Sequence, residues 1–206
     1  MKKTLITLIA VFGFYNLSLA QTKGNIEFGV QAGFTNSSVQ VNANNSSYNF
    51  FGGFNTGLTG DYYFSDRWSF KAALNYDQKG WGNGFIITPN GVETDHVSYR
   101  LNYLTVPLMA NWHFGHTRNW YLNFGPYVGF LLSASNSAYN TDIKSSFNSV
   151  DGGLAFGIGI KIPVSPKTKI FFEYGGQSGV SNIFSNTTDG SRVQNVMESI
   201  NVGFNF

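Results

Sequence analysis

Residues 103–134 read YLTVPLMANWHFGHTRNWYLNFGPYVGFLLSA, and this stretch decides the predicted fold. Its apolar residues recur at every second position on both sides of a short polar break at residues 115–119. A period of two places them on one face of two extended strands, and the break has the length of a hairpin turn. The opposite face is mixed, with tyrosine, asparagine, glycine and serine side chains from Tyr103 to Ser133. Such a hairpin belongs either to a soluble fold with an apolar core or to a membrane barrel whose apolar face meets lipid.

The same alternation recurs along the chain and predicts eight strands. We expect them at residues 25–34, 50–64, 68–77, 103–114, 120–134, 153–162, 170–177 and 199–206. Their connections alternate between long, at 35–49, 79–97, 135–150 and 179–194, and short, at 65–67, 115–119 and 165–168. Short turns on the periplasmic side and long loops on the other side are typical of an outer-membrane barrel. An even number of strands then places both termini in the periplasm.

The N-terminus has the composition of a secretory signal peptide. Lys2 and Lys3 precede a mostly apolar segment at residues 5–19, and residues 18–20 read Ser-Leu-Ala. A positive start, an apolar centre and a small-x-small end predict cleavage after Ala20. A retained membrane anchor is the less favoured interpretation, because the segment is short and interrupted by polar residues. We therefore expect a signal peptide at 1–20 and a single barrel domain at 21–206, located in the outer membrane.

Composition excludes several classes of function. The chain has no cysteine, which excludes disulfides, thiolate metal sites and a lipid attachment site. Loss of Lys2 and Lys3 with the signal peptide reduces 13 basic residues to 11, against 11 acidic residues. A balanced charge without a basic run gives no case for nucleic acid as a partner or for surface binding to anionic lipid. Charged residues make up 12% and aromatic residues 17%, which together with 24 glycines is unusual for a soluble domain.

Two observations favour the membrane barrel over a soluble eight-stranded barrel such as a lipocalin. The mixed face is crowded with glycine and charge, which does not suit an apolar ligand cavity. The uniform face carries aromatic residues near the strand ends, as in the girdle at a lipid–water interface: Tyr62, Phe64, Trp68, Trp112 and Trp120. The prediction is an all-β, eight-stranded, antiparallel, up-and-down transmembrane barrel. We expect a monomer whose surroundings are outer-membrane lipid.

Several motifs also carry a resemblance to a known family. Residues 76–80 (YDQKG), 101–108 (LNYLTVPL), 124–129 (FGPYVG) and 151–153 (DGG) stand in order and in phase with the predicted strands. In combination they resemble the small outer-membrane β-barrel domain family, often described as a porin family, which includes the PorT-like proteins. The likeness covers essentially all of the mature chain. It implies a non-catalytic outer-membrane barrel without a single common activity, and PorT-like members assist type IX secretion.

The last strand adds a further expectation from this resemblance. Residues 203–206 read GFNF, and Gly203, Phe204 and Phe206 look like the aromatic-ended final strand that the barrel-assembly machinery reads. The resemblance therefore implies that this machinery is a partner of the chain.

The mixed face places charges inside the predicted barrel. Pairing across the turn at 65–67 sets Asp61 opposite Lys71, and pairing across the turn at 165–168 brings Lys161 near Glu173. An eight-stranded barrel has a lumen just wide enough for its own side chains, and buried charges are stable there only when paired. We therefore interpret these four residues and Glu27 as a polar plug. The alternative, a selectivity ring in a pore, requires a wider barrel.

Two prolines conflict with the central strands, because each removes a donor from the hydrogen-bond ladder. A β-bulge at Pro107 and another at Pro126 would reconcile the sequence with the strands.

Candidate catalytic residues are scarce. Asp95, His96 and Ser98 are the one surface grouping that combines an acid, an imidazole and a hydroxyl, and neighbouring residues in a loop are more often solvated than catalytic. His113 and His116 lack partners at metal-ligand spacing. We therefore expect no enzyme activity, no cofactor and no metal.

The favoured hypothesis is a structural or surface-interaction protein that binds through its four long loops, because loops of about 15 residues exceed what strand reversal requires. A surface protein or a secretion-system protein is then a partner. Candidate contact residues in these loops, which fit the outer aromatic girdle equally well, are Tyr48, Phe50, Phe51, Trp81, Phe85 and Tyr139. The alternatives are a PorT-like secretion accessory, a small-solute channel and, remotely, a lipid-modifying enzyme.

Overall fold

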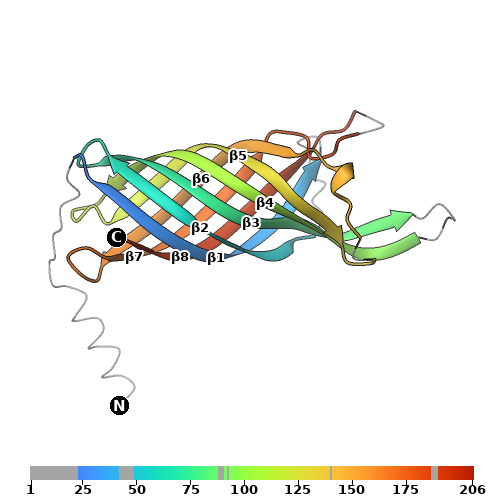
Figure 1. Cartoon of the computed structure of the whole chain (residues 1–206), viewed down its shortest axis with the longest axis horizontal. Helices are drawn as coiled ribbons and strands as arrows, with labels where there is room; N and C mark the ends of the chain where they lie inside the picture. Colours follow the sequence, from blue (N-terminus) through green and yellow to red (C-terminus); the bar gives the residue numbers. More distant parts are fainter. Residues whose placement is uncertain (1–22, 42–48, 88–90, 92, 140, 187–189) are drawn as a thin grey trace, which may run out of the picture.

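The structure is a computed structural model that describes residues 23–41, 49–87, 91, 93–139, 141–186 and 190–206. Its strands are β1 (Ile26–Val41), β2 (Phe51–Tyr63), β3 (Trp68–Ile87), β4 (Glu93–Phe114), β5 (Trp120–Asn136), β6 (Val150–Pro163), β7 (Lys169–Gly179) and β8 (Val193–Asn205). Each strand pairs antiparallel with the next, and β8 pairs with β1 to close the ring (Figure 1). The predicted eight-stranded antiparallel barrel is confirmed. The predicted signal peptide, residues 1–20, lies outside the described residues.

The described helical content is one short 3-10 turn, η1 (Lys144–Ser146), in the β5–β6 connection. None of the described residues forms a helix with the length and apolar character needed to cross a membrane.

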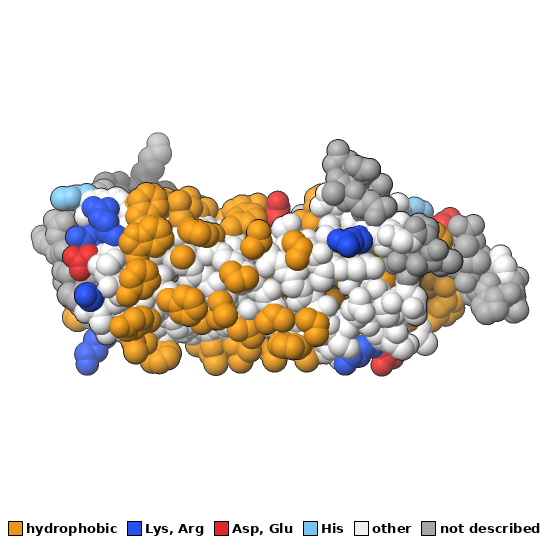
Figure 2. Space-filling view, turned by 90° about the horizontal axis from the view of Figure 1, so that it is seen from above, with side chains coloured by type: hydrophobic (Ala, Val, Ile, Leu, Met, Phe, Trp, Pro, Cys, Tyr) orange, Lys and Arg blue, Asp and Glu red, His pale blue; other side chains and the backbone are white. Residues whose placement is uncertain are grey.

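The apolar faces of the strands form a band on the outer wall. Phe34 is 82% exposed and Ile200 is 67% exposed, although neither side chain carries a polar atom. Figure 2 shows these side chains in orange, from near the short-turn end at the left to past the middle of the barrel. Polar side chains prevail farther to the right, toward the long connections. An outward band of this kind is the surface that meets hydrocarbon in a membrane barrel.

The band ends on the long-connection side at a row of polar side chains. We call the outward-facing residues of this row the polar ring: Asn36, Gln78, Asn102, Ser133 and Glu198. Gln78 Nε2 donates to Asn102 Oδ1 at 3.3 Å, and Asn102 Nδ2 donates to Ser133 Oγ at 2.9 Å. Because amides and carboxylates do not remain in hydrocarbon without cost, the polar ring marks one boundary of the band.

The predicted aromatic girdle lies on the outer wall beside the short turns. Tyr62, Phe64, Trp68, Trp112 and Trp120 are all exposed there. The ring centroids of Trp68 and Trp112 are 6.4 Å apart, and Phe114 links Trp112 to Trp120 at 5.2 Å and 6.4 Å. Indole and phenol rings favour this position at the other boundary of an apolar band.

The predicted loop at residues 79–97 is instead an extension of the barrel. Strands β3 and β4 continue to Ile87 and from Glu93, with Lys79 opposite Leu101 and Trp81 opposite Tyr99. This hairpin projects at the right of Figure 1. β1 likewise continues to Val41, into the region predicted as the first loop. The prediction failed there because strands beyond the apolar band have no lipid-facing residues, so the alternation that marks a membrane strand is lost.

The bulges predicted at Pro107 and Pro126 are absent from the ladder. The pairs Pro107–Tyr127, Ala110–Phe124 and Pro126–Leu154 keep one continuous register on their strand pairs. A proline removes one donor, and its φ is compatible with extended backbone, so the ladder resumes on either side of it.

The bulge that the structure describes between β4 and β5 lies nearer the long connections than either proline. Tyr103 pairs with Leu131 but Asn102 pairs with Ser133, so β5 has one extra residue at this point. Leu131 keeps the inward alternation of β5, and the extra residue then turns Ala134 inward and leaves Ser133 on the outer wall. The prediction that Ser133 faces the interior is therefore wrong.

Candidate functional site

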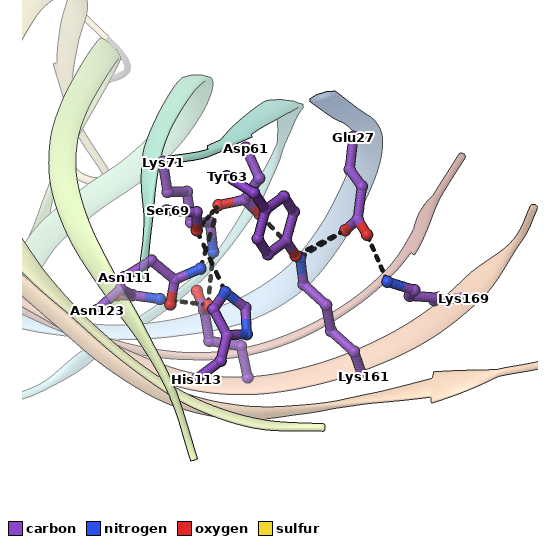
Figure 3. A network of polar contacts seen from close by, with 11 residues as sticks. Glu27, Asp61, Tyr63, Ser69, Lys71, Asn111, His113, Asn123, Lys161 and Lys169 are labelled. Atoms are coloured by element: carbon purple, nitrogen blue, oxygen red, sulfur yellow. Dashed lines mark hydrogen bonds and ion pairs between the residues drawn. The ribbon is translucent and has the colours of Figure 1, made fainter. Parts of the chain in front are cut away.

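The interior at the short-turn end is filled by a network centred on Lys161 of β6 (Figure 3). Its Nζ donates to Glu27 Oε2 and Asp61 Oδ2, at 2.9 Å each, and to Tyr63 OH at 3.0 Å. Lys169 donates to the other carboxylate oxygen of Glu27. Two buried carboxylates thus face two ammonium groups, which offsets the hydration that all four lose.

The second oxygen of Asp61 is bound by neutral side chains. Its Oδ1 accepts from Ser69 Oγ at 3.0 Å and from Asn111 Nδ2 at 3.1 Å. Ser69 Oγ in turn lies 3.2 Å from His113 Nε2, and His113 is fully buried. We call this set the basal network: Glu27, Asp61, Tyr63, Ser69, Asn111, His113, Lys161 and Lys169. Both oxygens of its central carboxylate are occupied by partners from the barrel itself.

A second ion pair crosses the lumen next to the basal network. Lys71 of β3 binds Glu173 Oε2 of β7 at 2.6 Å, and Asn123 Nδ2 donates to the same oxygen at 2.7 Å. The Lys71 ammonium also lies 5.4 Å from the centroid of the Tyr121 ring and 5.7 Å from that of Phe171. This pair is therefore enclosed by an amide and two aromatic rings.

The five charges that the sequence places in the lumen are all buried, but their pairing differs from the prediction. Asp61 and Lys71 are cross-strand neighbours as expected, yet Lys161 binds Asp61 and Glu173 binds Lys71. The predicted Lys161–Glu173 contact is wrong, because Glu173 stands opposite Gly159 while Lys161 stands opposite Phe171. In a narrow lumen a lysine side chain can reach across the bore, so cross-strand position alone does not select its partner.

A third charged group lies farther toward the long connections. Lys79 Nζ binds Asp151 Oδ2 at 3.1 Å, and the same carboxylate accepts from Tyr127 OH at 3.1 Å and Asn195 Nδ2 at 3.0 Å. The Lys79 ammonium is 4.6 Å from the centroid of the Tyr127 ring. Sequence reasoning used Lys79 and Asp151 as family motifs and missed this ion pair. Extending the inward alternation from Lys71 through odd-numbered positions would have reached Lys79.

The β7–β8 connection is attached to this group. Ser181 Oγ donates to Asp151 Oδ1 at 2.8 Å, and the amide of Gly152 donates to Ser181 Oγ at 2.8 Å. Asn148 of the β5–β6 connection donates through its Nδ2 to the carbonyls of Asn182 and Phe184, at 2.8 Å and 3.0 Å. The two connections are thus hydrogen-bonded to each other and to the barrel interior.

These connections bring apolar side chains into the mouth of the barrel. We call the resulting buried cluster the apolar cap: Val39, Trp81, Leu101, Tyr103, Leu131, Ala134, Phe147, Ile183 and Val193. Trp81 stacks on Tyr99 at a centroid distance of 4.7 Å, and Phe147 stacks on Phe184 at 5.0 Å. The two connections contribute Phe147 and Ile183 and the strands contribute the other residues, so that the cluster fills the long-connection end with apolar surface that water would otherwise contact.

The candidate contact residues of the loops divide into two groups. Phe50, Phe85 and Tyr139 are exposed, and Phe51 is partly buried. Trp81 is only 4% exposed and belongs to the apolar cap, so its prediction as a surface contact is wrong. Strands β3 and β4 remain paired through this segment, and the alternation of the strand therefore points the side chain of Trp81 into the bore. Tyr48 lies outside the described residues.

The C-terminal residues help to close the ring. Phe204 and Phe206 are exposed on the outer wall, and β8 pairs with both β1 and β7. Gly203 faces inward, where a Cβ would lie 2.4 Å from Cζ of Phe171. The structure therefore gives Gly203 a packing role that is independent of any assembly signal.

The residues considered for catalysis have other contacts. His96 Nδ1 lies 2.6 Å from Asn83 Oδ1, and the amide of Ser98 donates to Ser137 Oγ at 2.9 Å. Asp95 is exposed. Within the described part of the chain, no three histidine or acidic side chains are grouped as a metal site.

Comparison with known structures found similar proteins. OprG, an outer-membrane protein of Pseudomonas aeruginosa, is similar with a TM-score of 0.50 at 15% identity, over 90% of this chain and 98% of that one. Neisserial surface protein A gives a TM-score of 0.49 at 16% identity, over 85% and 95% of the two chains. The Yersinia pestis attachment invasion locus protein, Ail, gives 0.44 at 18% identity, over 90% and 100%.

Comparison with curated protein sequences found no match. A family model described as the outer membrane protein beta-barrel domain matches residues 19–185, which is most of the chain. The resemblance seen in the motifs is therefore confirmed. With the closed ring of antiparallel strands, this match shows that the chain belongs to the outer membrane protein beta-barrel domain family.

Proposed function

We propose that this protein is a non-enzymatic outer-membrane barrel with a closed lumen, which serves as a structural and surface-interaction protein through its long connections. The observation that supports this most directly is the filling of the bore at successive levels. The basal network, the Lys71–Glu173 pair, the Lys79–Asp151 pair and the apolar cap follow one another from the short turns to the long connections.

Below the apolar cap, the described part of the bore leaves little room for a solute. One cavity between the amide side chains of Gln31, Asn55, Asn123, Gln177 and Asn201 has a volume of about 40 Å³. A volume of that order holds about one to three water molecules. A migrating ion would have to break the Lys71–Glu173 and Lys79–Asp151 ion pairs, each of which is also held by a hydrogen bond from a neutral side chain.

The long-connection end is larger than strand reversal requires. The β3–β4 hairpin continues beyond the polar ring, and two other connections are built into the apolar cap. Extended and internally bonded connections on a rigid scaffold are where binding residues are commonly found. We therefore place the interaction surface on this end, which faces the cell exterior in the proposed orientation, with Phe50, Phe85 and Tyr139 as its exposed aromatic residues.

A closed lumen predicts the absence of steady ion conductance in planar bilayers. Wild type and Glu173→Gln are both expected to give silent membranes, because neutralising one partner of the Lys71 pair does not remove the basal network or the apolar cap. Protection of the barrel from added protease would show that the protein has inserted. A steady conductance whose ion selectivity differs between the two proteins would contradict the proposal.

In-cell photo-crosslinking tests the interaction surface. A photoreactive phenylalanine analogue in place of Phe85 is expected to crosslink to a cell-surface macromolecule, whereas the same analogue in place of Asp66 in a short turn is not. Both positions are exposed, so they form a matched pair at opposite ends. Crosslinks confined to the Asp66 position would contradict the assignment and would instead favour a PorT-like role on the periplasmic side.

A further inference from the structure

Arg100 of β4 lies on the outer wall just beyond the polar ring. It is exposed, its neighbours Tyr99 and Leu101 pack inside the barrel, and Asn102 of the polar ring is two residues away on the same face. Successive same-face residues of a strand are about 6.6 Å apart along it. The guanidinium therefore stands at the level at which lipid headgroups begin.

The surroundings of Arg100 form a shallow polar pocket. The pocket is lined by Phe51, Ser98, Arg100, Ser135, Asn136 and Ser137. Ser135 is the direct cross-strand partner of Arg100 on β5, and Ser98 and Ser137 are held together by two hydrogen bonds of 2.9 Å. Serine hydroxyls thus lie next to the arginine along two neighbouring strands.

On the side of β3, the guanidinium of Arg100 lies beside an aromatic ring. Gly80 is the cross-strand partner of Arg100 on β3, and a Cβ at this position would lie 3.2 Å from Cδ1 of Phe51. Arg100 Cζ lies 5.8 Å from the centroid of the Phe51 ring. Stacking of this kind restricts a guanidinium while leaving its N–H groups available for an anion.

Arg100 also lacks a carboxylate partner among the described side chains. The described ion pairs are Lys71–Glu173, Lys79–Asp151, Arg118–Asp66, Lys161–Glu27, Lys161–Asp61 and Lys169–Glu27. Arg118, at the short-turn end, is thus paired with Asp66 at 3.4 Å, whereas Arg100 has no ion-pair partner among the described side chains. An arginine with free donors at a membrane surface is suited to bind a phosphate through two parallel hydrogen bonds.

We propose that Arg100, with the hydroxyls of Ser98 and Ser135, binds the phosphate of an outer-leaflet lipid headgroup. The three groups supply the donors that a phosphate monoester requires, at the end of the apolar band where the lipid chain would lie. The choice of leaflet depends on the proposed orientation of the barrel, but the phosphate chemistry does not. Such a site would fix one lipid at the β3–β4–β5 wall.

The test uses the full-length mature protein in lipid nanodiscs that contain lipid A, followed by native mass spectrometry of the released protein. Wild type is expected to retain one lipid A, and Arg100→Gln to retain about tenfold less, which is the loss expected for a charge-assisted, bidentate contact. Arg67→Gln is the matched control, because Arg67 is an exposed arginine in a short turn at the opposite end, and its retention is expected to equal that of wild type. Ser135→Ala is expected to fall between the two arginine variants.

Three further measurements test whether the protein recognises the phosphate, the lipid chains and the positive charge of Arg100. Dephosphorylated lipid A should not be retained, and inorganic phosphate should not displace the intact lipid, because it lacks the chains that the apolar band holds. Arg100→Lys should restore retention in part, and circular dichroism should show that each variant is folded. Equal retention by wild type and Arg100→Gln, or displacement by inorganic phosphate, would overturn the proposal. Neither outcome bears on the closed lumen or on the crosslinks at Phe85, so the two proposals fail separately.

Discussion

Replacing Lys161 by methionine is expected to lower the free energy of unfolding by about 3–5 kcal/mol, because the substitution leaves buried carboxylates without their shared ammonium. Lys161 is the one described side chain that binds both Glu27 and Asp61. Methionine has much of the length and apolar volume of lysine. The decrease in stability therefore comes mainly from the missing charge and not from a cavity. The measurement is urea-induced unfolding of the barrel in phospholipid vesicles.

Lys167 provides the control for this experiment. It is exposed in a short turn of the same β6–β7 hairpin, and Lys167→Met is expected to change stability by less than about 0.5 kcal/mol. Adding Asp61→Asn to the Lys161→Met protein should recover part of the loss, because Asp61 is the carboxylate that loses its ion-pair partner, whereas Glu27 keeps Lys169. Equal free energies of unfolding for Lys161→Met and Lys167→Met would show that the ion pairs of Lys161 do not stabilise the barrel.

Asp151→Asn is expected to destabilise the barrel by about 3–5 kcal/mol, because it removes the carboxylate that binds the buried Lys79 ammonium. Asn is nearly the same size as Asp, so packing against Tyr127 and Asn195 is retained. Ser181 also loses its ionised acceptor, so the β7–β8 connection should be cut faster by protease. Unfolding in urea and limited proteolysis of the same sample measure the two effects.

The surface ion pair of the short turns gives the matched comparison. Asp66 binds Arg118 at 3.4 Å but is largely exposed, and Asp66→Asn should cost less than about 1 kcal/mol. Ser181→Ala should cost about 1 kcal/mol, since it removes the hydrogen bond and leaves the Lys79–Asp151 pair intact. Equal losses for Asp151→Asn and Asp66→Asn would show that burial of the Lys79 pair has no energetic consequence.

The proposed lipid site and the closed lumen concern different faces of the same strands. On β4, Arg100 faces outward and Leu101 inward, and on β3, Lys79 faces the bore while Gly80 leaves space on the outer wall. The alternation of inward and outward residues therefore positions both the charged side chains in the lumen and the residues on the outer wall. A lipid held at this wall would contact the extended hairpin that carries Phe85.

The sequence alone determined the ring of eight strands, the three short turns, the outward position of the aromatic residues beside those turns and the inward position of Glu27, Asp61, Lys71, Lys161 and Glu173. These properties are local, since lipid on one face imposes a period of two that neighbouring residues reveal. Only the tertiary structure decided which of these charged side chains form ion pairs with each other. Lys161 and Glu27 are 134 residues apart, and Lys71 and Glu173 are 102 apart. Contacts across a closed bore depend on strand register, bulges and side-chain reach, which no local pattern encodes. The same holds for the apolar cap, because connections that fold back into the mouth follow no periodicity.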